Sequence, residues 1–252
     1  MAARGMPDPA SVVEEKPFTP RGEAGLAAAA PPFRILRTTE TDEYEEGAGG
    51  APEMFGETAA LAAAAGDDFA GTSRKASKLS IPDGPVKKFA DLKDLMDSLP
   101  DDQDMIHHQP PIKDNATSRR TAEEKRNVRV NVFLYAASRE NDNDFHLIIG
   151  RDPDAEGDEL YMTAELSGLP PAGSPSSAKL KAARKSFKDF FADDLPGSKY
   201  DFYDPPIPVQ IEGPIFFDIT HAHGGRPGPK SLRAHMPTIW EIHAISKITF
   251  DA

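Results

Sequence analysis

The stretch from Ile207 to Phe250 constrains the fold more than any other part of this chain. Two apolar runs with the alternation of strands flank a long loop that is rich in Gly, Pro and His and carries no acidic residue. Strands leave backbone groups unpaired unless other strands lie beside them, so the rest of the chain must supply a sheet around these two runs. The stretch therefore predicts a β domain that presents the loop between its last two strands.

Composition separates the first third of the chain from the rest. Among 252 residues the formal net charge is −12, and cysteine is absent. This excludes disulfides and thiolate metal sites and disfavours general binding of polyanions by the whole chain. Residues 1–75 are rich in Ala, Gly, Pro and acids but poor in large apolar side chains, which predicts a disordered tail. We expect an amphipathic helix and a linker in residues 76–126, and one domain in residues 127–252.

From Asn127 onward the hydrophobic period is two, as in half-buried strands. The expected strands span residues 128–136, 144–150, 160–166, 209–219 and 239–250, and one helix is expected over residues 177–192. The order β-β-β-α-β-β predicts a mainly β fold, a small five-stranded OB-like barrel whose helix lies between strands three and four and closes one end. The alternative is an open α+β sheet with the helix across one face.

Two upstream segments have patterns of their own. Residues 84–99 carry apolar side chains at helical spacing, with Pro85 suited to a first turn and Pro100 as a stop, so one amphipathic helix is expected there. Residues 32–37 are apolar and basic, and residues 40–46 are mostly acidic. This island is either a solvated accident of composition or a short motif that docks on a partner or folds back on the domain.

A set of short motifs resembles a known group of proteins. The segments DFHLII at residues 144–149, GPIFFD at 213–218 and WEIH at 240–243 are similar to the D-x-H-L, F-D and E-[IL]-H-P-V pattern of uncharacterised bacterial OB-like barrel proteins. The resemblance covers about residues 128–250 and implies a small OB-like barrel with a shared site, but no activity. Ala244 stands where the group has Pro, so the end of the last strand is expected to run straighter.

The same motifs hold the candidate metal ligands. Asp144 and His146 are two residues apart and project from one face of their strand, and Glu241 and His243 do so on the last strand. In an OB-like barrel these four residues and Glu165 would share the outer face that commonly binds ligands. Imidazole and carboxylate ligands suit zinc or another divalent ion. The alternative is that each imidazole only hydrogen-bonds a neighbouring acid or carbonyl.

The acid-free loop over residues 220–238 is the candidate ligand-binding site. Loops at this position of OB folds often grip nucleic acid or sugars, and Gly228 and its neighbours would let backbone amides approach a phosphate. Phe133 and Tyr135 on the first strand are candidate stacking platforms. The alternative is that the loop pairs with acidic segments of the same chain. The candidate basic residues are His221, His223, Arg226, Lys230, Arg233 and His235.

These patterns favour a non-enzymatic OB-like binding module, which binds nucleic acid or another polyanion through the loop. No catalytic residue and no cofactor is assigned, because no nucleophile elbow, P-loop or dinucleotide motif is present. One alternative is a metal-dependent phosphodiester hydrolase that uses the His and carboxylate residues, and another is an interaction protein with a partner motif in its tail. No transmembrane segment or classical signal peptide is recognised, so a cytoplasmic bacterial protein is expected, with non-classical export left open.

Overall fold

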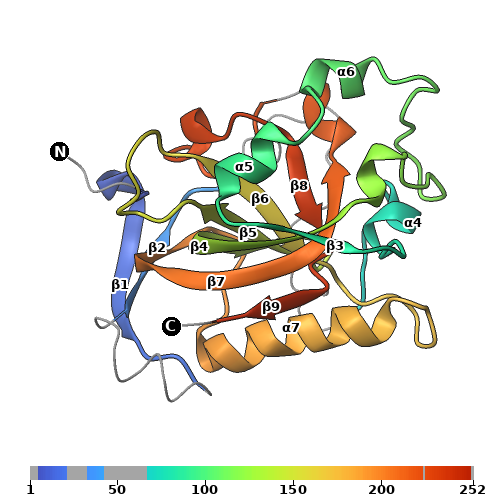
Figure 1. The fold of residues 1–252 in the computed structure, drawn as a ribbon. Coiled ribbons are helices and arrows are strands. Elements are labelled where there is room, and N and C mark those ends of the chain that lie inside the picture. The colour runs from blue at the N-terminus through green and yellow to red at the C-terminus, as the bar shows by residue number, and fades with distance from the viewer. Residues whose placement is uncertain (1–4, 22–32, 43–66, 224, 251–252) are drawn as a thin grey trace.

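The computed structural model describes residues 5–21, 33–42, 67–223 and 225–250. The fold is mainly β, and the described strands form one nine-stranded sheet accompanied by few helices (Figure 1). No helix in these ranges combines the length and the apolarity that a membrane crossing requires.

Five strands of the sheet pair in a ring. β4 pairs with β5, β5 with β6, β6 with β8, β8 with β7, and β7 again with β4. The β6–β8 pairing is parallel and the others are antiparallel. The second and third of these strands pair with each other, and the third also pairs with the fifth. The bounds are Asn127–Arg139 for β4, Phe145–Gly150 for β5, Tyr161–Leu166 for β6, Asp201–Phe217 for β7 and Trp240–His243 for β8.

The helix expected between the third and fourth of these strands is α7, Ser177–Phe191. Its Phe side chains are buried in the main hydrophobic core. Phe187 lies 4.9 Å from Phe145 of β5 between ring centroids, and Phe190 stacks on Phe250 at 3.8 Å. In Figure 1 the helix lies beside β9 at one side of the sheet. The face that α7 buries includes Leu180, Ala183, Phe187, Phe190 and Phe191.

The last strand is shorter than predicted. Instead of one strand over residues 239–250, the chain forms β8 and then a separate β9, Lys247–Thr249, which pairs with β7. The backbone leaves β6 after the N–H of Ile245 donates to the carbonyl of Glu165, and the N–H of Ser246 donates to the carbonyl of Glu212 in β7. Gly213 permits this approach, because a Cβ there would lie 2.6 Å from the carbonyl oxygen of Ala244. The expectation of a straighter strand end after Ala244 is therefore wrong.

The prediction of one helix over residues 84–99 is also wrong for the first half of that range. Residues Val86–Phe89 form β3, which pairs in parallel with the start of β4. The helix α5, Leu92–Asp97, begins only after Asp91, whose carboxylate accepts the backbone N–H of Lys93 as an N-cap. A further short helix, α6 at Asp102–Ile106, lies in the predicted linker, as does the 3₁₀ turn η2 at Glu123–Lys125.

The predicted disordered tail contains two strands. β1 spans Val12–Phe18 and β2 spans Phe33–Thr38; β2 pairs with β1 and with residues 201–204 of β7. Phe18, Phe33 and Ile35 enter the main core, which gives these segments the apolar burial that their composition did not suggest. The prediction of disorder is therefore wrong for the described parts of residues 1–75, and the rest lies outside the described residues. The apolar-basic motif folds back on the domain, one of the alternatives weighed from the sequence.

A buried ion pair joins the segment before β3 to the sheet. This segment includes the short helix α4, Lys75–Lys78. The guanidinium of Arg74 donates to both carboxylate oxygens of Glu124 at 2.7 and 2.8 Å and to the carbonyl of Phe217 at 2.9 Å. Glu124 also accepts the backbone N–H of Phe217. Neither charged side chain is exposed to solvent, so each depends on the other for compensation.

The first prediction concerns this pair. Arg74→Met and Glu124→Gln should each lower the free energy of unfolding by about 3–5 kcal/mol, because either change leaves a buried charge without its partner. The double variant Arg74→Met/Glu124→Gln should cost less than the sum of the two single changes. Urea unfolding measures these values. Lys93→Met, at the exposed pair of Lys93 and Asp97, is the control and should cost at most about 0.5 kcal/mol. Strict additivity at Arg74 and Glu124 would contradict the assignment.

The second prediction concerns Asp201, at the β2–β7 junction. Burial raises the pKa of Asp201 to about 7, against the opposing effect of Arg37. The folded state thus holds this proton more tightly than the unfolded chain, so the contribution of Asp201 to stability is fully present below about pH 4 and is lost as the pH rises through about 7. Asp201→Asn should remove this part of the pH dependence. Thermal unfolding between pH 4 and 8 tests it, and an unchanged pH profile in the variant would show that Asp201 does not titrate in this window.

Candidate functional site

The histidines and acids singled out in the sequence converge in the folded chain. His146 of β5 is in register with Glu165 of β6, which is in register with His243 of β8. Asp144 immediately precedes β5, and Glu241 lies two residues before His243 on the same strand. These five side chains are each at most 3 % exposed. The pairing of β5, β6 and β8 therefore brings two i, i+2 pairs and one further acid into one interior cluster.

This burial corrects one expectation, because the cluster does not lie on an open outer face. The rings of Tyr200 and His146 are 6.0 Å apart, and the ammonium of Lys78 lies 3.9 Å from Glu165. A second hydrophobic cluster, which includes Leu232 and Met236 of the loop, packs over this side of the sheet. The face that was expected to bind ligands is covered by other segments of the same chain.

Asp144, Glu165 and His243 form what we call the inner group. Each offers a ligand atom, and these atoms all lie within 4.8 Å of one another. Nδ1 of His243 hydrogen-bonds Oε1 of Glu241 at 2.9 Å, which places Nδ1–H as the donor and leaves the lone pair on Nε2. That Nε2 faces Oδ2 of Asp144 at 3.5 Å. Two acceptor atoms therefore face one another in the absence of a proton or cation between them.

Burial sets the protonation states of the inner group. It raises the pKa of Asp144 well above its usual value, and the carboxylates of Asp142 and Glu165 add to this rise. Burial likewise lowers the pKa of His243 and raises that of Glu241. Glu165 differs: burial would raise its pKa, but Lys78 and His243 hold it well below the usual range. Without a cation, the group is held by protons and by one lysine.

Asp42, Glu140 and His146 form the outer group, which also offers three ligand atoms within 4.8 Å of one another. Nδ1 of His146 lies 2.6 Å from Oε1 of Glu140, 3.8 Å from Oδ2 of Asp42 and 3.9 Å from Oε1 of Glu165. Burial would lower the pKa of His146, but Glu140 raises it to about 10. Sequence reasoning missed three site residues, Asp42, Glu140 and Lys78. The acidic island over residues 40–46 pointed to Asp42 alone, and no sequence pattern pointed to the other two.

The loop over residues 220–238 is folded onto the domain. Gly228, Leu232 and Met236 are buried, and two 3₁₀ turns, η4 at Ile219–His223 and η5 at Arg233–His235, shape it. The backbone N–H of Gly228 donates to Asp42, and the N–H and hydroxyl of Ser231 donate to Glu40. The amides expected to approach a phosphate thus hold carboxylates of the N-terminal segment, in line with the alternative that the loop pairs with acids of the same chain.

The loop's charged residues do not join the buried cluster. Arg226 and Lys230 are exposed, and Arg226 donates to the carbonyl of Met236 at 3.1 Å. Arg233 donates to the carbonyl of Gly228 at 2.9 Å. Polyanion binding through these side chains stays a prediction. His221 lies 3.8 Å from Asp218, His235 is exposed with its ring 6.3 Å from that of Tyr161, and the side chain of His223 lies outside the described residues.

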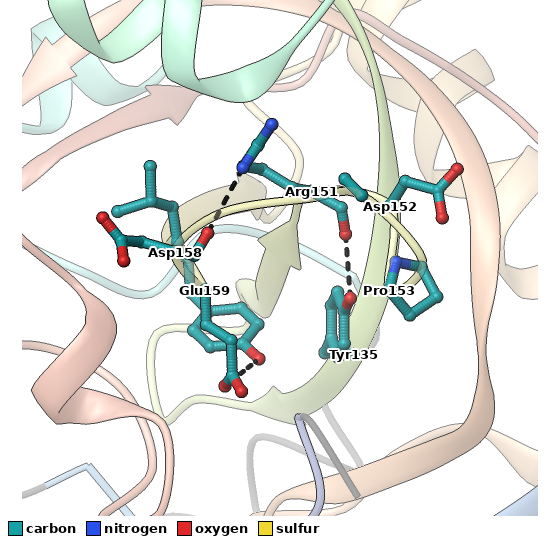
Figure 2. Close-up of a pocket in the computed structure, with 9 residues that line it drawn as sticks. Tyr135, Arg151, Asp152, Pro153, Asp158 and Glu159 are labelled. Carbon is teal, nitrogen blue, oxygen red and sulfur yellow. Dashed lines mark hydrogen bonds between the residues drawn. The ribbon is translucent and has the colours of Figure 1, made fainter.

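The two proposed stacking residues differ in exposure. Phe133 is half-buried, whereas Tyr135 is 3 % exposed because a bulge in β4 between Leu134 and Ala136 turns it inward. Figure 2 shows the Tyr135 hydroxyl directed at the carbonyl of Arg151, to which it donates at 2.8 Å. The ring of Tyr135 also packs edge-on against Tyr161 at 4.9 Å. Tyr135 is therefore a packed core residue, and the expectation that it stacks on a ligand is wrong for this arrangement.

Comparisons with known proteins add no functional information. No family model, no curated protein and no solved structure matches this chain. The resemblance of its motifs to bacterial OB-like proteins stays a prediction, and function must be argued from the buried groups themselves.

The third prediction concerns Lys78. Lys78→Met should lower the free energy of unfolding by about 2–4 kcal/mol in the presence of a chelator, because it removes the ammonium that compensates Glu165 in the interior. Lys125→Met, at an exposed lysine, is the matched control and should change stability by no more than about 0.5 kcal/mol. Urea unfolding at pH 7 compares the two. Equal stability of the two variants would mean that Lys78 does not balance the cluster.

Proposed function

We propose that the chain is an OB-like binding module whose interior binds a divalent metal ion between Asp144, Glu165 and His243. The ring of five pairings supports the OB-like part, since the parallel pairing of its third and fifth strands and the helix between the third and fourth fit that topology. The inner group supports the metal.

The single observation that carries the proposal is a set of unpartnered ligand atoms. Oδ2 of Asp144 and Nε2 of His243 are buried and lack a hydrogen-bond partner, and Oε2 of Glu165 is a third buried ligand atom, 2.7 Å from Nδ1 of His243. The other oxygen of Asp144 accepts the backbone N–H of Gly168 at 2.5 Å, so the side chain is fixed with its second oxygen toward His243. Buried polar atoms are almost always paired, so two unpartnered acceptor atoms that face each other beside a buried carboxylate support a bound cation.

The charge of the surroundings favours a cation as well. The carboxylates of Glu165, Asp218 and Glu241 raise the pKa of Lys78. Those of Glu165 and Asp218 also raise the pKa of Glu241, so these acids act on one another in the same interior region. A buried carboxylate is costly unless it is paired, coordinated or protonated. A divalent ion would compensate several of these acids at once, whereas Lys78 supplies a single charge.

The donor set suits zinc best among common divalent ions. One imidazole nitrogen and carboxylate oxygens are ordinary zinc ligands, while calcium and magnesium prefer oxygen alone. The hydrogen bond from Nδ1–H of His243 to Glu241 is the outer support that metal-bound histidines usually have. Burial raises the pKa of Asp144 and of Glu241, and carboxylates bind metal ions in their deprotonated form, so metal binding should release protons.

The enclosure favours a bound structural ion over hydrolysis. Catalytic zinc sites keep one position open to water or substrate, while structural sites are closed. All three inner ligands are at most 3 % exposed. The hydrolase alternative therefore receives no support from this geometry, and the ion would act by stabilising the fold that presents the module's surface.

The fourth prediction tests the metal. Wild-type protein, stripped with a chelator and reloaded with Zn²⁺, should retain stoichiometric zinc in elemental analysis, and its melting temperature should rise on loading, since an ion at 100 times its dissociation constant adds about 2.7 kcal/mol. Asp144→Asn and His243→Gln should each bind one ion fewer than the wild type. His235→Asn, which alters an exposed histidine, should bind as the wild type does. Wild-type protein that holds no zinc and melts at the same temperature with and without it would refute the proposal.

A further inference from the structure

Resting on the proposed function, we infer that the same interior holds a second divalent ion in the outer group, bound by Asp42, Glu140 and His146. Glu165 would then bridge the two ions. The docked N-terminal segment completes this second site, because Asp42 is the ligand that it contributes.

Carboxylates gather around the imidazole of His146. Three carboxylates from different segments surround its Nδ1: Glu140 at 2.6 Å, Asp42 at 3.8 Å and Glu165 at 3.9 Å. A single ring N–H can donate to only one of them, and it is closest to Glu140. The remaining convergence of acids around one imidazole has the composition of a divalent cation site.

Glu165 lies between the inner and the outer group. Its Oε1 lies 3.9 Å from Nδ1 of His146 in the outer group, and the same carboxylate offers a ligand atom to the inner group, within 4.8 Å of those of Asp144 and His243. The side chain is 3 % exposed, and its Oε2 lies 2.7 Å from Nδ1 of His243. One carboxylate with an oxygen in each group is the usual bridge between two ions in a paired site.

The carboxylate of Asp42 supports a cation in the outer group independently of Glu165. Its side chain is 9 % exposed, and its Oδ1 is buried without a hydrogen-bond partner. Its Oδ2 is fixed by the backbone N–H of Gly228 at 2.9 Å and the hydroxyl of Tyr200 at 3.2 Å. A carboxylate is thus held in position beside His146 with one oxygen left over, which a bound cation would use.

Glu40 offers a matched control for Asp42. It belongs to the same segment and fixes it to the same loop through Ser231, at 3.0 Å from the backbone N–H and 2.9 Å from the hydroxyl. Glu40 is not part of either ligand group. A variant at Glu40 therefore weakens the docking of the segment without removing a proposed ligand.

Elemental analysis and Mn²⁺ electron paramagnetic resonance of the full-length protein test the inference. Wild-type protein should bind two ions per chain and show the signal of two coupled Mn²⁺ ions. Asp42→Asn and Glu140→Gln should bind one ion and show an uncoupled six-line signal, while Asp144→Asn should also bind one ion. Glu40→Gln should keep two ions and the coupled signal.

Each other result has a distinct meaning. Wild-type protein with one ion, lost in Asp144→Asn but kept in Asp42→Asn, would overturn the second site and leave the proposed function intact. Wild-type protein with no ion would overturn both. Loss of one ion in Glu40→Gln as well as in Asp42→Asn would show that docking, and not ligation by Asp42, decides binding, and would overturn the assignment of Asp42. Two ions without coupling would overturn the bridge of Glu165.

Discussion

The cost of burying charge governs this structure. β5, β6 and β8 place Asp144, Glu165 and His243 in an interior where water does not reach them, and a carboxylate in such a place must be protonated, paired or coordinated. The molecule uses the first two solutions in different places: burial keeps the pKa of Asp144 high, while Lys78 and His243 keep that of Glu165 low. Unlike the apolar core around Phe187, this region has a stability that depends on the protonation of its side chains.

The cover over these groups is built from segments that are far apart in the chain. The Arg74–Glu124 pair fixes the stretch that contains Lys78, and β2 brings Asp42 next to His146. Each cover segment thereby delivers a charged side chain as well as apolar area. Exclusion of water strengthens the attraction between the opposite charges and raises the cost of any charge left unpaired. Cover and cluster therefore stabilise each other, and neither can be altered alone.

Local pattern predicted the strands of the ring and the convergence of its histidines. A period of two located β4, β5 and β6, and the i, i+2 spacing put Asp144 with His146 and Glu241 with His243 on shared faces. What pattern could not supply were features decided by tertiary partners. β3 is a four-residue strand that forms because the start of β4 lies beside it. β8 ends at His243 because the backbone N–H of Ser246 donates to the carbonyl of Glu212 in β7 and not to β6. Asp42 and Glu140 occupy no periodic position, so only the folded chain relates them to His146.

The N-terminal segment shows why composition misjudged the first third of the chain. Disorder is expected where too little apolar surface is available to offset the entropy of ordering. β2 nevertheless buries Phe33 and Ile35, and the acids that follow it are held by donors: Glu40 by Ser231, and Asp42 by Gly228 and Tyr200. Acidic residues that count toward disorder in a composition are here the contacts that order the segment. Their stabilising effect depends on the acid-free loop over residues 220–238, in which the backbone N–H groups of Gly228 and Ser231 donate to these carboxylates. The acidic N-terminal segment and the acid-free loop over residues 220–238 are therefore complementary in charge, and together they cover the interior site.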